Sequence, residues 1–409
     1  MTVLTEPERL LLLCLRSAIR RDSISLDAPL SLEDWKSLRT LAVQQRLIPL
    51  MAESFSDGRV LSSVPGEWNR LREAARKLTI RQAAGTAEFL LLYERLRSLG
   101  LSPAVVKGIV CRSLYPEPEQ RASSDEDLLI APEDYPAYRD ALLDCGLHLL
   151  DPDTPAEGND EVTFVDPERK LYLEVHMRLF STSEEAKGYR DLNRFFEGVL
   201  ARTVELPVYG QKVRTLEPTD HLLFLLCHAY KHMLYGGVGI RQICDLCLFA
   251  ARYENDVDWT RLRQSCSELN MLKLAAAFFR IGQQRLDISA PAVFAGLEVD
   301  ELPLLKDCLG GGLYGADDPD RLHSSHLTLD AVAADRQGRG RRGMLRALFP
   351  KGDGLKRSYP YLKQKPWLLP LAWGQRMWRY ASARDTSAGK SLEIGRERIA
   401  LLKQYELLK

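Results

Sequence analysis

The chain has 409 residues, 45% of them hydrophobic, and its 56 basic side chains equal its 56 acidic ones. This length suggests two or three domains with buried cores. Because the net charge is zero, the protein as a whole has no positive field that would attract nucleic acid or anionic membranes. At the start of the chain, Glu6 and Glu8 precede a short apolar run, a pattern that fits neither a signal peptide nor a membrane span. We therefore expect a cytoplasmic protein without stable membrane insertion, in which the eight cysteines stay reduced.

Residues 1–100 are expected to form a helical domain, because their apolar residues recur at helical spacing. The clearest amphipathic runs are "LRTLAVQQRLIPLMAESF", residues 38–55, and "RQAAGTAEFLLLYERLRSLG", residues 81–100. Gly100 is expected to close the second of these helices, since glycine accepts the left-handed backbone that often follows a helix.

Residues 101–218 are expected to form a small α/β domain, because short β-like runs alternate with helical ones. The runs "PAVVKG" (103–108) and "DEDLLIA" (125–131) predict strands, and a helical pattern follows each of them. The predicted helices cover residues 109–115 and 132–146, and further predicted strands cover residues 146–151, 161–166 and 171–180.

Residues 219–409 are expected to form a second helical domain. Thr219 is the expected N-cap of a helix that ends at Gly236, since threonine is common before the first turn and glycine after the last. Farther along, residues 315–326 combine Gly, Asp, Ser and His, and we expect them to form a linker.

The helix predicted around residues 241–253 contains Cys244 and Cys247, and His228 and His232 lie one turn apart just before it. Four such ligands would suit a tetrahedral zinc site. The two cysteines nevertheless lie among apolar residues of an amphipathic helix, where free cysteines behave as small hydrophobic side chains. Core packing is therefore the favoured interpretation and a zinc site is the alternative.

Three consecutive acidic residues, Asp125 to Asp127, stand directly before an apolar strand. Side chains alternate along a strand, so Asp125 and Asp127 share one face while Glu126 lies on the other. The same rule places Glu174 and His176 together on a later strand. Carboxylates on one face repel each other unless a cation lies between them, and three of them suit the two Mg²⁺ ions that serve phosphoryl or nucleotidyl transfer. An ordinary strand with an acidic, solvent-facing side is the alternative.

The pair Lys107-Gly108 ends the first predicted strand and begins the helix that follows it. Backbone N–H groups at a helix start, together with an adjacent lysine, suit the phosphates of a nucleoside triphosphate. We therefore expect an anion cradle that faces the same strand ends as the carboxylates. The alternative is a simple strand-to-helix turn that needs glycine for its backbone.

The string "VVKGIVCRSLYPEPEQRASSDEDLLI", followed by "LEVHMRL", resembles the uncharacterised nucleotidyltransferase family of the DNA polymerase beta-like superfamily. The similarity continues through "HAYKHMLYGGVGIRQICDLCLF" and covers roughly residues 30 to 250. It implies an α+β fold, with a polymerase beta-like nucleotidyltransferase core of a small mixed sheet and helices between N- and C-terminal helical domains. It further implies Mg²⁺ or Mn²⁺, a nucleoside triphosphate donor with ATP as the first choice, and an acceptor that is a peptide, a protein, a small molecule or RNA.

The resemblance also implies roles for individual residues. Where the wider superfamily has Gly-Ser and a third aspartate, this chain has Lys107-Gly108 and Glu174. The implied metal ligands and catalytic residues are Asp125, Asp127 and Glu174. The implied nucleotide-binding residues are Lys107, Gly108, Arg121, Ser124, His176, His228, Lys231, His232, Arg241 and Asp245.

Two of these assignments also rest on helical spacing. His228 and His232 share a stripe with His221, so they would either face the nucleotide or satisfy polar groups in the core. Arg241 and Asp245 are four residues apart and are expected to pair within one helix.

The segment from Arg336 to Arg379 contains twelve basic residues and one acid, with aromatic residues interleaved. Such a segment could bind RNA, an anionic peptide or a lipid surface, although a solvated tail is the favoured interpretation. The sequence thus favours an enzyme that transfers a nucleoside monophosphate, or a related phosphoryl group, to a hydroxyl or phosphate acceptor. The alternative is a catalytically weak binding module that acts through this basic segment.

Overall fold

The computed structural model describes residues 3–26, 28–55, 58–64, 66–152, 159–168, 171–183, 186, 188–312, 319–336, 359–363, 365–382 and 388–408. None of the helices formed by these residues is both long enough and apolar enough to cross a membrane.

The N-terminal segment is helical, as predicted. It consists of α1 (Glu6–Arg20), α2 (Leu32–Gln44), α3 (Ile48–Ser54), the short 3₁₀ helix η1 (Gly58–Leu61) and the long α4 (Glu67–Ser98). The single amphipathic run predicted over residues 38–55 is wrong in one respect, because Arg46 adopts a left-handed φ of 54° and separates α2 from α3. At the end of α4, Gly100 has φ 82° and the N–H of Leu101 bonds to the carbonyl of Leu96, which confirms the predicted C-cap.

The central sheet contains the five strands that the sequence predicted. They are β1 (Ala104–Val106), β2 (Glu126–Leu129), β3 (His148–Leu149), β4 (Glu161–Asp166) and β5 (Leu171–His176), in the order β1-β2-β5-β4-β3. Strands β2 and β5 pair in parallel, and the other neighbours pair antiparallel. The predicted helices of this segment are α5 (Gly108–Arg112) and α6 (Tyr135–Asp144), and the 3₁₀ turns η2 (Pro118–Gln120) and η3 (Pro132–Asp134) precede β2 and α6. The α+β fold with a small mixed sheet is therefore confirmed.

A second sheet was not predicted. The 3₁₀ helices η5 (Arg190–Phe196) and η6 (Val199–Arg202) lead into a hairpin of β6 (Thr203–Val208) and β7 (Gln211–Leu216). Its two turn residues, Tyr209 and Gly210, have φ values of 50° and 78°, the positive values that a two-residue hairpin turn requires. The Tyr-Gly pair between two β-branched runs was the available sequence signal.

The C-terminal part is helical, as predicted, with one cap placed differently. Thr219 was expected to cap α7, but the N-cap is Glu217, whose carboxylate accepts hydrogen bonds from the N–H groups of Thr219 and Asp220. An acidic side chain two residues earlier reaches the same N–H groups and also complements the positive helix end. The helices are α7 (Pro218–Tyr235), α8 (Ile240–Arg252), α9 (Trp259–Glu268), α10 (Leu272–Leu286), α11 (Ala292–Ala295), α12 (Leu302–Gly311), α13 (Pro319–Arg336), α16 (Leu369–Ser382) and α17 (Ala388–Gln404), with 3₁₀ turns η7 (Pro360–Lys363) and η8 (Pro366–Leu368).

The linker predicted over residues 315–326 is wrong from residue 319 onward, because α13 begins at Pro319, and residues 315–318 lie outside the described residues. Most of the basic segment lies outside the described residues, namely Arg339, Arg341, Arg342, Arg346, Lys351, Lys356 and Arg357.

Helices α13 and α17 close the C-terminal end of α7. The carbonyls of a last helical turn have no partner within the helix. In this protein Arg398 donates to the carbonyls of Met233 and Tyr235, Thr328 donates to Leu234, and Arg321 donates to Gly236. Side chains from the end of the chain therefore complete the helix that carries several predicted site residues.

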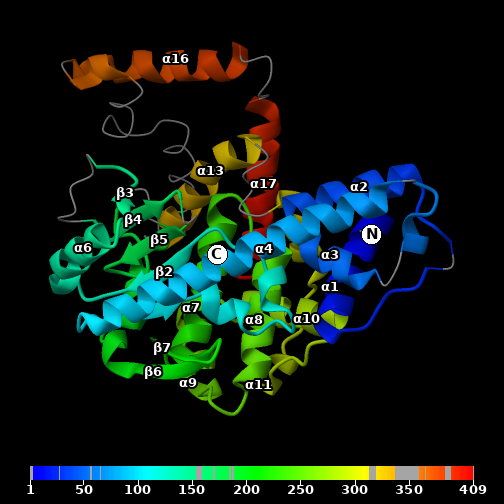
Figure 1. Cartoon of the computed structure of the whole chain (residues 1–409). Helices are drawn as coiled ribbons and strands as arrows, with labels where there is room; N and C mark the ends of the chain where they lie inside the picture. The colour runs from blue at the N-terminus through cyan, green and yellow to red at the C-terminus, as the bar shows by residue number, and fades with distance from the viewer. Residues whose placement is uncertain are drawn as a thin grey trace.

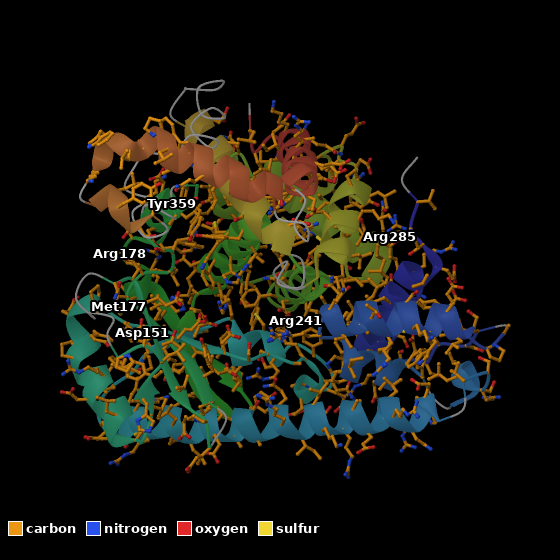
Figure 2. All side chains as sticks on the ribbon, turned by 90° about the horizontal axis from the view of Figure 1, so that it is seen from above. Asp151, Met177, Arg178, Arg241, Arg285 and Tyr359 are labelled. Atoms are coloured by element: carbon orange, nitrogen blue, oxygen red, sulfur yellow. The ribbon has the colours of Figure 1, made fainter. Side chains whose placement is uncertain are left out.

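A single buried apolar cluster runs from the N-terminal helices through the sheet to α17. Helix α4 passes beside the sheet, and α16 lies along the top edge of the molecule (Figure 1). Seen from above, Arg241 lies between these two layers (Figure 2), where its side chain is 3% exposed. The predicted site residues consequently meet in the interior, between the sheet, α7 and α8.

Candidate active site

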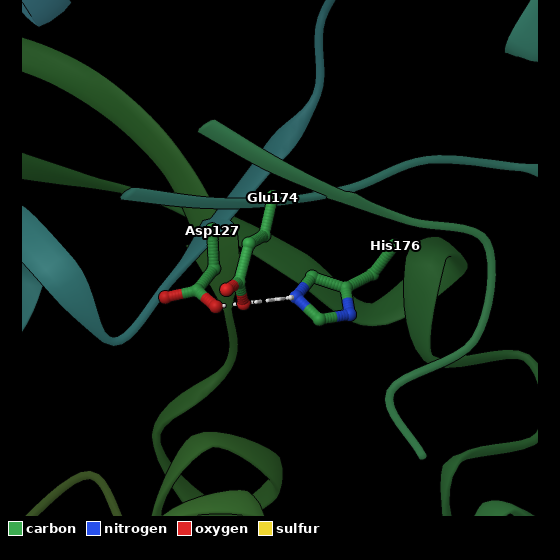
Figure 3. Close-up of side chains that lie close together, drawn as sticks. All are labelled: Asp127, Glu174 and His176. Atoms are coloured by element: carbon green, nitrogen blue, oxygen red, sulfur yellow. Dashed lines mark hydrogen bonds and ion pairs between the residues drawn. The ribbon is translucent and has the colours of Figure 1, made fainter. Parts of the chain in front are cut away.

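The strand pairing brings the central side chains of the site together. In the parallel pair β2–β5, Asp127 stands opposite Glu174, and in the antiparallel pair β4–β5, Glu161 stands opposite His176. Ligand atoms of Asp127, Glu174 and His176 all lie within 4.8 Å of one another (Figure 3). The alternation rule placed Glu174 and His176 on one face, but only the pairing of the two strands places Asp127 beside them.

Lys107 is the cation at the centre of this group. Its Nζ lies 2.8 Å from Oδ1 of Asp127 and 3.1 Å from Nε2 of His228. Burial by itself would lower the pKa of Lys107, but the charges of Asp127, Asp125 and Glu174 outweigh it and raise this pKa above its usual value. The pKa of Asp127 is lowered, because Lys107 and His176 outweigh the effect of its burial. Asp127 is therefore ionised and Lys107 is protonated at neutral pH.

The backbone of Lys107 is held in an unusual conformation. Its φ of 54° and ψ of −124° form a combination that residues with a side chain rarely adopt. The Lys107 N–H donates to Nε2 of His221 over 3.3 Å, and Nδ1 of His221 lies 3.1 Å from the hydroxyl of Thr215. Burial lowers the pKa of His221 to about 3, so the ring is neutral and can accept at one nitrogen and donate at the other. The sequence placed His221 on the right stripe, but it did not indicate this supporting role.

The predicted anion cradle at Lys107-Gly108 is wrong in one respect. The N–H of Ile109, in the first turn of α5, already donates to the Glu126 carboxylate over 2.7 Å, and Arg112 pairs with the same carboxylate. A Cβ at Gly108 would collide with Glu126, so this glycine accommodates an internal acid. Glu126 faces away from Asp127, as the alternation rule predicted, and its burial explains why a charged residue stands between the two aspartates.

A cavity of about 390 Å³ opens next to the central group. Burial would lower the pKa of His176, but hydrogen bonds with Asp127 and Glu174 raise it to about 9. Burial raises the pKa of Glu174, and the nearby charges of Asp127 and Glu161 act in the same direction. The cavity and the central group beside it therefore contain more acidic side chains than cationic ones. The lining includes the predicted residues Lys107, Ser124, Asp125, Glu174, His176, His228, Lys231 and His232, together with Glu161, Tyr172, Leu179 and Phe224.

Asp125 differs from the other two predicted metal ligands. It lines the cavity, but the close group of ligand atoms does not include it, and its carboxylate accepts from the hydroxyl of Ser124 over 3.2 Å. His176 takes the third place in that group. Oxygen ligands from carboxylates suit Mg²⁺ and Mn²⁺, and the surplus of acids over cations leaves a charge for such an ion to neutralise. The residues therefore fit a divalent metal.

The remaining predicted residues, Gly108, Arg121, Arg241 and Asp245, line a smaller hollow of about 40 Å³ next to Lys107 and Asp125. Asp245 also has partners from outside its helix, because Arg121 binds its carboxylate through two nitrogens at 2.9 and 2.6 Å, and Tyr115 donates to it. The charges of Arg121 and of Arg241, four residues before Asp245, lower the pKa of Asp245 despite its burial. A partner that arrives from another element cannot be foreseen from spacing along one helix.

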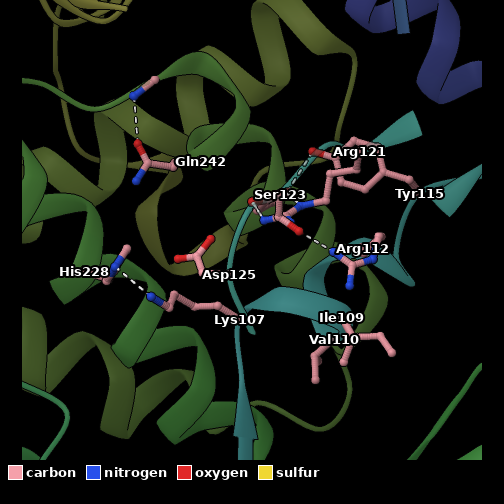
Figure 4. A network of polar contacts seen from close by, with 12 residues as sticks. Lys107, Ile109, Val110, Arg112, Tyr115, Arg121, Ser123, Asp125, His228 and Gln242 are labelled. Atoms are coloured by element: carbon pink, nitrogen blue, oxygen red, sulfur yellow. Dashed lines mark hydrogen bonds and ion pairs between the residues drawn. The ribbon is translucent and has the colours of Figure 1, made fainter. Parts of the chain in front are cut away.

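Two of the hydrogen-bond donors that line this hollow are Arg121 and Gln242, and the sequence predicted only Arg121. Among the described buried polar atoms that lack a hydrogen-bond partner are two at this hollow, Nη1 of Arg121 and Nε2 of Gln242. Gln242 lies close to Asp125 and Lys107 across the hollow (Figure 4), and it was missed because a single glutamine on a helix carries no motif. Unsatisfied donors beside a lysine favour an anionic ligand.

The two cysteines of the predicted zinc alternative pack in the core. Cys244 and Cys247 are 0% and 1% exposed, and the Cys247 thiol donates to the carbonyl of Phe278. His228 instead contacts Lys107 and His232, 3.1 Å away in each case. The histidines thus belong to the cavity and the cysteines to the packing of α8 against α10.

Comparison with protein families matches residues 31–287 to a family described as "Uncharacterised nucleotidyltransferase". Neither the curated proteins nor the solved structures include a match to this chain.

Proposed function

The chain belongs to the uncharacterised nucleotidyltransferase family, and on that premise we propose that it moves a nucleoside monophosphate, or a related phosphoryl group, from a nucleoside triphosphate to a hydroxyl or phosphate acceptor. ATP is the proposed donor, and a peptide is one proposed acceptor beside a protein, a small molecule or RNA. The observation that carries the proposal is the meeting of Asp127, Glu174 and His176 beside Lys107, where the cavity lined by Glu174 and His176 adjoins the hollow lined by Asp127.

Asp127 and Glu174 would hold a divalent metal, Mg²⁺ or Mn²⁺, with Asp125 next to them on the cavity wall. When bound, the ion would neutralise charge on the phosphate oxygens during transfer. His176 keeps both carboxylates oriented, because its Nε2 lies 3.1 Å from Asp127 and 3.6 Å from Glu174. Such supporting contacts tune the ligands of metal sites.

The phosphates of the donor would lie between the cavity and the smaller hollow, since Lys107 borders both. Lys107 supplies a positive charge to them, and the unpartnered donors of Arg121 and Gln242 can bind the terminal phosphate oxygens. Glu174, which borders the cavity, would accept the proton of the acceptor. Catalysis would thus come from positioning and charge stabilisation.

The test is a thermal-shift titration with ATP, with and without Mg²⁺, on the wild type, Asp127→Asn and Asp125→Asn. A ligand that binds the folded protein raises its melting temperature. We expect ATP and Mg²⁺ together to stabilise the wild type, and Asp127→Asn to lose at least tenfold in apparent affinity, with a smaller loss for Asp125→Asn.

Asp140→Asn is the matched control, because Asp140 is an exposed acid on α6 that contacts its neighbour Arg139. Equal stabilisation of Asp127→Asn and wild type by ATP and Mg²⁺ would contradict the metal assignment. No stabilisation of the wild type by any nucleoside triphosphate would favour the binding-module alternative.

A further inference from the structure

A groove of about 440 Å³ lies on the side of the site that faces α4. Four of its lining residues, Leu78, Arg81, Gln82 and Gly85, follow one another at spacings of three, one and three along α4. Residues at these spacings share one face of a helix, so the groove has a continuous helical wall. The opposite walls are the junction of α2 and α3, the loop before β2, and the start of β5.

The groove and the catalytic cavity meet. Both are lined by Ser124, Asp125 and Tyr172, whereas Lys107 lines the cavity and not the groove. Contacts from the groove walls hold the loop at this junction. The side-chain oxygen of Gln82 accepts the N–H of Ser123 over 2.7 Å, and Arg46 donates to the Ser124 hydroxyl over 3.2 Å. A molecule in the groove would therefore reach Asp125 through a hollow that Lys107 does not line.

The lining of the groove combines apolar and cationic groups. Val43 and Leu78 are 55% and 38% exposed, so they offer apolar surface to a ligand in the groove. Arg46 and Arg81 lie at the same groove, and among the described residues neither forms an ion pair with a carboxylate. The chemistry that matches both features is an apolar body that carries an anionic group.

Gly85 adds a second, independent feature. A glycine in the interior of a helix weakens it relative to alanine. A Cβ at Gly85 would meet no atom within 4 Å, so no packing neighbour requires glycine there. The missing side chain leaves open space at the groove wall, which favours a binding role for this stripe of α4.

We propose that this hollow, the acceptor groove, binds the acceptor substrate, a molecule with an apolar body and a phosphate or carboxylate group that Arg46 and Arg81 recognise. The inference rests on the proposed function. In the transfer, the acceptor oxygen forms a bond to the α-phosphorus while the bond from that phosphorus to the bridging oxygen breaks. Pyrophosphate leaves with the electron pair, and the acceptor proton passes to Glu174. In-line transfer requires the acceptor oxygen and the leaving pyrophosphate on opposite sides of the phosphorus, and separate hollows for acceptor and donor suit that requirement.

The experiment uses 1-naphthyl phosphate as the probe, with 1-naphthoate and neutral 1-naphthol beside it, in calorimetric titrations of the full chain. We expect the two anions to bind at least tenfold more tightly than 1-naphthol. The difference between phosphate and carboxylate identifies the favoured anion. Binding of 1-naphthyl phosphate is expected to persist in saturating ATP and Mg²⁺, because the donor occupies the Lys107 side.

Arg81→Glu and Gly85→Leu are each expected to weaken the binding of 1-naphthyl phosphate at least tenfold. The first variant repels the anion by its charge, and the second fills the groove. Arg76→Glu and Gly85→Ala are the matched controls. Arg76 lies on another face of α4, and alanine adds only a Cβ, so changes of less than twofold are expected. Far-UV circular dichroism of each variant checks that α4 remains folded.

Displacement of 1-naphthyl phosphate by ATP and Mg²⁺ would overturn the proposal, because the groove would then belong to the donor. Wild-type affinity in both Arg81→Glu and Gly85→Leu would overturn it as well. A wild type that binds the naphthyl anions but is not stabilised by ATP and Mg²⁺ would contradict the proposed function itself, which a separate titration measures.

Discussion

Lys107 shows at the scale of one residue how the site is built. Its left-handed backbone costs of the order of 1–3 kcal/mol, and a strained residue persists only where its surroundings hold it. His221 holds its N–H, while Asp127 and His228 hold its side chain. The strain is thus matched by contacts from β2 and α7, and it directs the ammonium group toward the carboxylates.

The neutral state of His221 makes a prediction about pH. Its pKa is about 3 in the folded protein, compared with about 6.5 in an unfolded chain, because it is buried. As the pH falls below about 6.5, the unfolded state takes up a proton that the folded state does not, and stability is lost down to pH 3. We expect His221→Gln to remove about one proton from the uptake that accompanies unfolding near pH 5.

Urea unfolding of both proteins between pH 4 and 7 measures this uptake as the slope of the unfolding free energy against pH. The pKa values of His228 and His232 are also lowered by burial, but these residues remain in both proteins, so the difference isolates His221. Parallel slopes for wild type and His221→Gln would show that His221 is protonated in the folded state.

Glu174 and His176 are expected to separate binding from chemistry. Glu174→Gln should abolish transfer but leave ATP binding largely intact, because Asp127 and the Lys107 side still hold the donor. His176→Ala should slow transfer by a smaller factor, about 10 to 100, since it orients the carboxylates. Single-turnover release of pyrophosphate beside equilibrium ATP binding measures both effects. An inactive His176→Ala beside an active Glu174→Gln would place the proton acceptor elsewhere.

At the scale of elements, the N-terminus of α7 depends on Glu217. Its carboxylate accepts two backbone N–H groups and pairs with Arg261. Glu217→Ala should lower the free energy of unfolding by about 1 kcal/mol, the usual value of an N-cap. Glu217→Gln keeps an oxygen acceptor and should lose less. Urea unfolding compares the two variants, and equal losses would show that the charge, and not the cap, stabilises the helix.

The acceptor groove makes a stability prediction for α4. Because Gly85 is helical and its Cβ position is open, Gly85→Ala should raise the free energy of unfolding by roughly 0.5–1 kcal/mol. The gain would come from helix propensity alone. Chemical denaturation measures it, and a loss of stability would indicate a neighbour that crowds this position.

At the scale of the whole molecule, the C-terminal helices act on the site through α7. Arg398 is 3% exposed, and burial lowers its pKa to about 10, so it stays charged at neutral pH while it binds the carbonyls of Met233 and Tyr235. Lys231 and His232 belong to the same last turns of the helix. Helix α17 therefore stabilises one wall of the cavity that Lys231 and His232 line.

Arg398→Met is expected to lower the free energy of unfolding by roughly 2–4 kcal/mol, because buried carbonyls lose a charged donor. The same variant should weaken binding of ATP and Mg²⁺, although Arg398 does not line the cavity. Arg396→Met, an exposed position on the same helix, is the control. Unfolding curves and thermal shifts test both effects, and unchanged ATP binding in a destabilised Arg398→Met would limit the role of α17 to stability.

The sequence by itself determined the elements and the faces of the strands, because these depend on local spacing. Alternation placed Asp125 and Asp127 on one side and Glu126 on the other, and helical periodicity located α4, α7 and α8. The two turn residues of the β6–β7 hairpin were visible in the sequence as well, although the hairpin was not predicted. The division into residues 1–100, 101–218 and 219–409 stays a prediction, and the apolar cluster crosses both boundaries.

Only the tertiary structure decided which side chains meet, because partners far apart in the chain have no spacing in common. The parallel pairing of β2 with β5 placed Glu174 beside Asp127, and the packing of α8 placed the Asp245 carboxylate against Arg121. The burial of Glu126 under Gly108 turned an expected phosphate cradle into an internal contact. Residues are chosen locally, but the electrostatic role of each one depends on which charges the fold places within a few ångströms of it.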